Sequence, residues 1–288
     1  FLYFYQQKVD IVLLEVGVGG LFDSTNIIHP MISVISSIGY DHIQILGNTL
    51  EKITEQKAGI IKEHSDTVYI EQNPEIDSII QKTCLEKHNT LHMVKPSEVN
   101  YVRFEKDRCI FDYKQYHDVE MNLKGNRQAQ NASLVLECCE ILNKNGYDIS
   151  EEIIREGLKT VIHRGRFEII HQSPTIIFDG GHNEEAIQNL KETIAVCYKE
   201  AKKIYVISVL KSKDYQKIID NLLEKNSIYI FTNGNDSKRY TDCHIMYQYA
   251  KQKNDRIEMY KMELENAIQF CREKIEYVSF IIGSFYIY

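Results

Sequence analysis

The stretch Asp10-Ile11-Val12-Leu13-Leu14-Glu15-Val16-Gly17-Val18-Gly19-Gly20 decides how this chain is expected to fold. Residues 9–16 are nearly all apolar, as in strands that are buried on both faces of a parallel sheet. Glu15 stands at the end of this run, and a glycine-dense turn follows it. Because open α/β proteins bind ligands at the carboxyl ends of their strands, we expect Glu15 to face a binding site.

The glycine turn does not match a known phosphate loop. No Gly-Lys-Ser or Gly-Lys-Thr follows Gly20, and Phe22 stands where a GxGxxG pattern needs its third glycine. The glycines therefore indicate only a tight turn. Glu15 itself has two interpretations, a functional carboxylate or a solvated one.

Two further segments are expected to serve the same site. Residues 31–38 predict a second buried strand, and His42 follows it in Gly39-Tyr40-Asp41-His42. Residues 49–61 predict a helix that begins at the N-cap Thr49 and contains Lys57. A carboxylate and an imidazole at neighbouring strand ends can share a cation such as Mg²⁺. The alternatives are a structural His42 and an exposed surface Lys57.

The rest of the first half alternates helices with short strands. Antiparallel strands are expected within residues 99–123, where short alternating segments replace the long apolar runs. The other expected elements are a strand over 67–70 and helices over 74–88, 126–142 and 150–160.

After residue 164 the pattern becomes a regular alternation of strand and helix, which is typical of a Rossmann-like domain with a parallel sheet. We therefore predict an α/β protein with two domains, over residues 1–163 and 164–288. Strands are expected at 175–178, 204–210, 227–231 and 278–286, and helices at 184–198, 214–225, 242–253 and 263–275.

A third candidate site is Asp179-Gly180-Gly181-His182-Asn183. A strand is expected to end at Asp179, and a helix is expected to begin near Asn183. Such a loop can face the phosphates of a nucleotide. The alternative is a plain connection in which Asn183 is only the N-cap of the helix.

Composition excludes several classes of protein. The chain has 288 residues and a net charge of −7 without a basic stretch, which argues against a nucleic-acid binder. Its seven cysteines form no CxxC pair, so reduced thiols and a cytoplasmic location are expected. No signal peptide is visible, and the apolar run over 277–288 is too short to cross a membrane.

Taken together, the motifs resemble the folylpolyglutamate synthase and dihydrofolate synthase family of Mur-type ligases. The matching residues are the segment from Glu15 to Asn26, Gly39 to His42, Leu46 to Leu50, Glu55 to Lys62, Asn131-Ala132, Gly165 to Glu168, Asp179 to Asn183 and Gly283-Ser284. They occur in the family's order and extend over nearly the whole chain, which makes the resemblance far more specific than any single motif.

The resemblance implies a role for each site residue. Glu15 and His42 would bind Mg²⁺, and Lys57 would be carboxylated on its Nζ so that the added carboxylate helps to position a metal. Asn131, Arg166 and Asp179 would contact ATP. Lys57 and His182 would be the catalytic residues.

The implied reaction is ATP-dependent ligation of L-glutamate to a folate or dihydropteroate carboxylate through an acyl phosphate. The expected partners are these small molecules, without nucleic acid or membrane, and a monomer is expected. The alternatives are another Mur-type amino-acid ligase or a non-catalytic nucleotide-binding remnant.

The sequence departs from the family pattern at two points. The family's Gly-Lys-Ser/Thr loop and a metal-binding serine precede the position of Glu15, and neither is present here, so a fragment with weak ATP binding is expected. Leu21 and Gly181 replace the family's usual Arg and Ala. Leu21 lies where the family handles the pterin, so this departure bears on the acceptor.

Overall fold

The computed structural model describes residues 1–105, 108–234 and 238–284. By its internal contacts the chain forms two compact units. The first comprises Phe1–Glu98 and Gln130–Ser150, and the second comprises Val99–Ala129 and Glu151–Tyr288. Each unit is described by itself. The predicted functional boundary at residues 163 and 164 stays a prediction.

The first unit is built on a parallel sheet. Its strands lie in the order β1 (Ile32–Ile35), β2 (Asp66–Ile70) and β3 (Thr90–Val94). Ile35 and Tyr69 point from one face of this sheet into a core shared with Ile53 of α3 (Leu50–Ala58). Helix α4 (Pro74–Glu86) contributes Ile76 and Ile80 to the same core. The predicted parallel α/β architecture of this unit is confirmed.

Capping residues set where these helices begin. The Thr49 side chain accepts a hydrogen bond from the Lys52 N–H, and the Asn73 side chain accepts one from Ile76, so both helices start at an N-cap. The remaining elements of this part are α1 (Leu2–Gln7), a 3-10 helix (Ser24–Ile27), α2 (Ile43–Leu46), a 3-10 helix (Pro96–Glu98) and α5 (Asn126–Lys144).

The predicted strand over residues 9–16 is wrong. These residues form no ladder with any described strand, and their side chains are largely exposed. The exposed fractions are 43% for Val9, 45% for Ile11, 40% for Val12 and 92% for Leu13. An apolar run becomes a buried strand only when neighbouring strands take up its backbone hydrogen bonds. Here the run instead borders an apolar hollow of about 540 Å³ with Val34, Cys138 and Leu142.

The second unit begins with an antiparallel sheet of β4 (Val99–Glu105), β5 (Arg108–Tyr113) and β6 (Tyr116–Met121). Helix α6 (Glu151–Thr160) packs on β6. The antiparallel pairing predicted within residues 99–123 is therefore confirmed.

The larger sheet of this unit has the order β11-β10-β9-β12-β8-β7. Its neighbours pair in parallel except β7 (Glu168–Gln172), which is antiparallel to β8 (Thr175–Asp179). The other strands are β9 (Lys202–Ile207), β10 (Ser227–Phe231), β11 (Glu258–Lys261) and β12 (Tyr277–Ile282). The predicted alternation of strand and helix is confirmed, and residues 285–286 of the predicted last strand lie outside the described residues.

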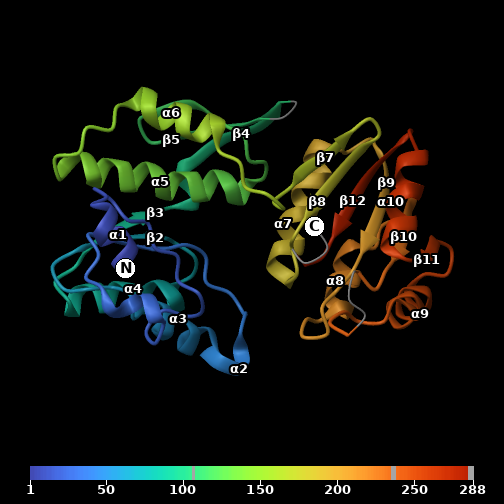
Figure 1. Cartoon of the computed structure of the whole chain (residues 1–288), viewed down its shortest axis with the longest axis horizontal. Coiled ribbons are helices and arrows are strands. Elements are labelled where there is room, and N and C mark those ends of the chain that lie inside the picture. The colour runs from blue at the N-terminus through green and yellow to red at the C-terminus, as the bar shows by residue number, and fades with distance from the viewer. Residues whose placement is uncertain (106–107, 235–237, 285–288) are drawn as a thin grey trace. The chain divides into compact units, whose positions relative to one another are not determined.

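Helices cover both faces of this sheet (Figure 1). Side chains of α7 (Glu184–Cys197), α8 (Tyr215–Leu222) and α9 (Cys243–Lys253) share one apolar core with Tyr205 and Tyr229. Helix α10 (Leu264–Glu273) packs on the other face with Ile204 and Ile230. Across the described part of the chain, no helix is long and apolar enough to cross a bilayer.

Candidate functional site

Asp23 organises the glycine turn after Glu15. Its carboxylate accepts hydrogen bonds from the backbone N–H groups of Gly17 and Val18, at 3.0 and 3.1 Å. It also accepts from the Thr25 hydroxyl at 2.6 Å and the Thr25 N–H at 2.9 Å. These bonds, above all those from Thr25, lower the pKa of Asp23 to about 2. The turn is therefore held by a hydrogen-bond network around an ionised carboxylate.

The same turn packs on the end of helix α3. The Leu21 N–H donates to the Gln56 carbonyl at 2.7 Å. A Cβ at Gly20 would lie 2.9 Å from the Gln56 carbonyl oxygen and 3.0 Å from that of Lys57. The backbone at Gly20 therefore lies so close to the end of α3 that only glycine fits there. The glycine turn thus packs on the part of the helix that contains Lys57.

Lys57 lies in the last turn of α3 and is half-buried. Burial lowers the pKa of its ammonium group below the usual range, and the charge of Asp41 acts in the opposite direction. An ordinary surface lysine would be fully solvated and would show no such effect. Lys57 is therefore partly shielded from water, and its catalytic role stays a prediction.

His42 lies beside the carboxylate of Asp41. It is the N-cap residue of α2, with a left-handed backbone at φ 49°, and its N–H donates to Asp41 Oδ1 at 2.9 Å. Its Nε2 lies 3.9 Å from Asp41 Oδ2. The structure thus joins His42 and Lys57 through Asp41, a residue to which the sequence reasoning assigned no role. The only signal in the sequence was a carboxylate directly before the histidine.

The predicted metal ligands Glu15 and His42 belong to no metal-binding cluster of described residues. Glu15 is exposed on an irregular segment. No group of three or more His, Cys, Asp or Glu side chains in the described ranges is arranged to hold a metal ion. A site made from Glu15 and His42 needs a further ligand, such as a carboxylated Lys57, and stays a prediction.

The predicted nucleotide residues divide between the two units. Asn131 lies in α5, in the part of that helix that belongs to the first unit. Arg166, Asp179 and His182 lie in the second unit. Their roles toward a nucleotide stay predictions.

Asp179 ends β8 and ties two loops together. Its Oδ2 accepts the Phe167 N–H at 2.9 Å, and its Oδ1 accepts the Gly181 N–H at 2.8 Å. Burial nevertheless raises the pKa of the Asp179 carboxyl, against the effect of these hydrogen bonds and of the Arg166 and His182 charges. Arg166 therefore lies close enough to Asp179 for their charges to interact.

Part of the loop after Asp179 is fixed by hydrogen bonds of its own backbone. The Gly180 N–H donates to the Gly165 carbonyl, and the Asn183 side chain caps α7 by accepting the Ala186 N–H at 2.9 Å. His182 Nδ1 lies 2.9 Å from the Gly180 carbonyl oxygen. The predicted N-cap role of Asn183 is therefore confirmed. The role of this loop toward a phosphate stays a prediction.

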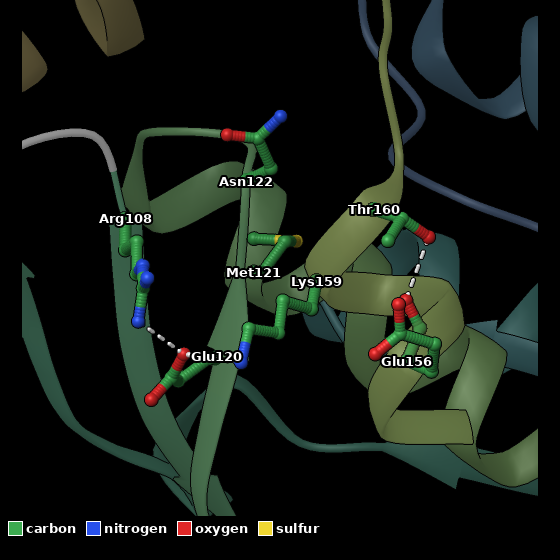
Figure 2. Close-up of a pocket in the computed structure, with 7 residues that line it drawn as sticks. All are labelled: Arg108, Glu120, Met121, Asn122, Glu156, Lys159 and Thr160. Atoms are coloured by element: carbon green, nitrogen blue, oxygen red, sulfur yellow. Dashed lines mark hydrogen bonds and ion pairs between the residues drawn. The ribbon is translucent and has the colours of Figure 1, made fainter. Parts of the chain in front are cut away.

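A separate hollow of about 400 Å³ lies between β6 and α6 (Figure 2). Its lining is Arg108, Glu120, Met121, Asn122, Glu156, Lys159 and Thr160. Arg108 and Lys159 both face the Glu120 carboxylate, at 2.7 and 3.6 Å. Its two cations are therefore already paired with a carboxylate, and we assign this hollow no ligand.

Two domain families match this chain. Residues 1–139 match the Mur ligase middle domain, and residues 165–282 match the glutamate ligase domain of Mur ligases. Relatives include the dihydrofolate synthase/folylpolyglutamate synthases of Bacillus subtilis, 40% identical over 230 residues, and Escherichia coli, 35% identical over 212 residues. The chain belongs to the folylpolyglutamate synthase/dihydrofolate synthase family of Mur ligases.

Solved structures of this family have the same fold. The Mycobacterium tuberculosis folylpolyglutamate synthase complexed with ADP and AMPPCP matches 99% of this chain with a TM-score of 0.86 and 25% identity. The Escherichia coli FolC complex with DHPP and ADP matches 99% with a TM-score of 0.82 and 27% identity. This chain covers 68% and 66% of those two chains.

The curated relatives in this family are longer than the aligned region. The alignments cover 77% of this chain and 53% of the Bacillus subtilis protein, and 73% of this chain and 48% of the Escherichia coli protein. The chain therefore spans about half the length of these two relatives.

Proposed function

We propose that this chain provides most of the catalytic apparatus of a ligase that uses ATP to join L-glutamate to a folate or dihydropteroate carboxylate. The observation that carries the proposal is the environment of Lys57. A half-buried lysine of lowered pKa lies at the end of α3, on which the glycine turn packs, and its charge interacts with that of Asp41, which lies next to His42. Related structures are complexes with ADP, AMPPCP and DHPP, which supports the choice of substrates.

Lys57 is suited to carry a carboxyl group. Only the neutral amine reacts with carbon dioxide, and burial increases the neutral fraction of Lys57 at a given pH. The product is an anion, which converts a group that would repel a divalent cation into one that can bind it. The donor chemistry then fits Mg²⁺, since Glu15, His42 and carboxylated Lys57 would supply two carboxylates and an imidazole. When bound, Mg²⁺ would neutralise phosphate oxygens during phosphoryl transfer.

The chain's own residues have separate tasks in the proposed reaction. The acceptor carboxylate attacks the γ-phosphorus of ATP, ADP leaves, and an acyl phosphate results. The glutamate amine then attacks the acyl carbon, loses a proton and displaces phosphate. Arg166 would stabilise negative charge on the transferred phosphoryl group. Asn131 and Asp179 would orient the nucleotide, and His182 would act near the reacting groups.

The proposal is tested with the product of the complete reading frame. ATP hydrolysis should require both a folate or dihydropteroate acceptor and L-glutamate, and the product should be the glutamyl amide by mass spectrometry. Activity with muramyl acceptors in place of folates would instead indicate another Mur-type ligase. Absence of turnover with any acceptor, in a folded protein that binds ATP, would favour a non-catalytic remnant.

A variant assay addresses Lys57 in the same protein. Lys57→Ala should abolish turnover, because the carboxylated side chain is lost, and small carboxylates such as acetate should restore part of the rate. The matched control is Lys52→Ala, an exposed lysine in the same helix, which should keep its activity. Wild-type turnover of the Lys57 variant would refute the carboxylation.

A further inference from the structure

The segment that joins β6 to α5 lies along helix α7, within the second unit. The Lys124 ammonium is 6.0 Å from the centre of the Phe167 ring, which packs in turn on Tyr198 at the end of α7. A Cβ at Gly125 would lie 2.9 Å from Thr193 Oγ1, and φ there is 116°. These contacts leave room only for glycine at position 125 and fix the segment against α7.

The same segment reaches the start of α7 through an ion pair. The Arg127 guanidinium binds the Glu185 carboxylate in the first turn of α7, 58 residues further along the chain. The Arg127 side chain is 27% exposed and that of Glu185 is 40% exposed. An ion pair that is partly shielded from water is screened less than a fully exposed one.

The first turn of α7 directly follows the loop that begins after Asp179. Asn183 caps the helix by accepting the Ala186 N–H, and the Gly181 N–H donates to Asp179. Helix ends open more readily than helix centres, because their first N–H groups have no partner within the helix. A contact that fixes Glu185 therefore also restrains the residues between Asp179 and Ala186.

We propose that Arg127 is a positioning residue, which holds the start of α7 and the Asp179–Asn183 loop in place through Glu185. The expected effect of Arg127 on nucleotide binding rests on the function proposed above. Its restraint of the loop does not depend on that function. Glu184, the neighbouring residue, is bound on the other side by Lys217 of α8 at 2.9 Å. Among the described residues, two ion pairs therefore hold the first turn, and the one made by Arg127 comes from the start of α5.

Hydrogen exchange of the present chain tests the restraint directly. The variants are Arg127→Ala, Glu185→Ala, their combination, and Arg127→Lys. The control is Lys202→Ala, which breaks the exposed Lys202–Glu276 pair of 3.2 Å in the same unit. We expect amides of residues 180–187 to exchange roughly fivefold faster in both single alanine variants, with no further increase in the combination. Arg127→Lys should keep part of the protection, and β10 should stay protected throughout.

Two results would overturn the proposal. One is unchanged exchange over residues 180–187 in Arg127→Ala while β10 remains protected. The other is additive effects of the two alanine substitutions, since Arg127 would then act on a group other than Glu185.

Calorimetric titration with ADP, performed on the product of the complete reading frame, is the second readout. If the proposed function holds, the wild-type product binds ADP and Arg127→Ala weakens the affinity about fivefold, whereas Lys202→Ala does not. Equal ADP affinity of wild type and Arg127→Ala would overturn the role of Arg127 in the nucleotide site. A complete wild-type product that binds no ADP would count against the proposed function, and the exchange experiment would still decide the positioning role.

Discussion

The Asp179 carboxylate accepts a hydrogen bond of 2.9 Å from the backbone N–H of Phe167, a residue that precedes it by twelve positions. This bond joins the entry to β7 with the end of β8. Because Gly181 donates to the other carboxylate oxygen, Asp179 ties the loop before β7 to the loop after β8. The carboxyl group is nevertheless buried enough for its pKa to be raised.

The raised pKa of Asp179 predicts how stability depends on pH. A carboxyl whose pKa is higher in the folded state favours folding most when it is protonated, so its contribution falls as the pH rises from the ordinary value of 3.8 through the raised value. The free energy of unfolding of wild type minus that of Asp179→Ala should therefore be larger at pH 4 than at pH 7. Urea titrations at the two pH values measure it. Asp255→Ala, at an exposed position, is the control, and an opposite trend would refute the raised pKa.

Replacing Gly20 with alanine should destabilise the first unit. The new Cβ would lie 2.8 Å from Ile60 Cγ2 and within 3.0 Å of two carbonyl oxygens, and such overpacking costs about 1–3 kcal/mol of unfolding free energy. The matched control is Gly157→Ala in α6, where the described residues leave the Cβ open space to 4 Å. That change should stabilise by about 0.5–1 kcal/mol. Chemical unfolding of both variants measures the difference, and equal stabilities would contradict the packing of the turn on α3.

Loss of the Asp23 carboxylate should loosen the glycine turn in a pH-dependent way. A pKa lowered to about 2 means that the ionised group stabilises the fold above the ordinary value of 3.8, and that this effect is lost as the pH falls through 2. Asp23→Ala should therefore have a lower Tm than wild type at pH 7, and the two values should converge near pH 2. Scanning calorimetry gives both values. A constant difference at all pH values would show that the side chain acts by packing and not by charge.

Asp41 should control the reactivity of Lys57. Its negative charge raises the pKa of Lys57, so Asp41→Asn should lower that pKa further and increase the neutral amine at a given pH. In ¹³C-labelled bicarbonate, the carboxylated lysine should then give a stronger carbamate signal by NMR at pH 7 than it does in wild type. Lys57→Arg should remove the signal, while Lys52→Arg should leave it unchanged. A carbamate signal that persists in Lys57→Arg would place the modification elsewhere.

Local sequence predicted the elements that depend on local rules. Helix α3 begins where the Thr49 N-cap predicted it, and β10 has the predicted bounds of residues 227–231. The apolar periodicity and the caps are encoded by neighbouring residues, so they can be recognised without knowing the fold. Sequence also identified the family, because several motifs occur in one order. Short or exposed elements such as β3, β11 and α2 were missed, since their patterns are too brief to stand out.

Residues 9–16 show where such reasoning fails. Their composition predicted a buried strand, yet a strand exists only when other segments supply ladder partners, and that is a property of the tertiary structure. Equally, Asp41 gained its importance from the fold, which sets its carboxylate beside His42 and Lys57.

By itself, the sequence determined the α/β class, the family and the residue types available for catalysis, because these follow from patterns along the chain. Only the tertiary structure decided that Lys57 is half-buried with a lowered pKa, that Asp179 is tied to Phe167, and that Arg127 binds Glu185. Desolvation and pairing between charges depend on which distant segments meet. The distance between two residues along the sequence does not tell whether they are close in space. Their closeness is set by the folded structure.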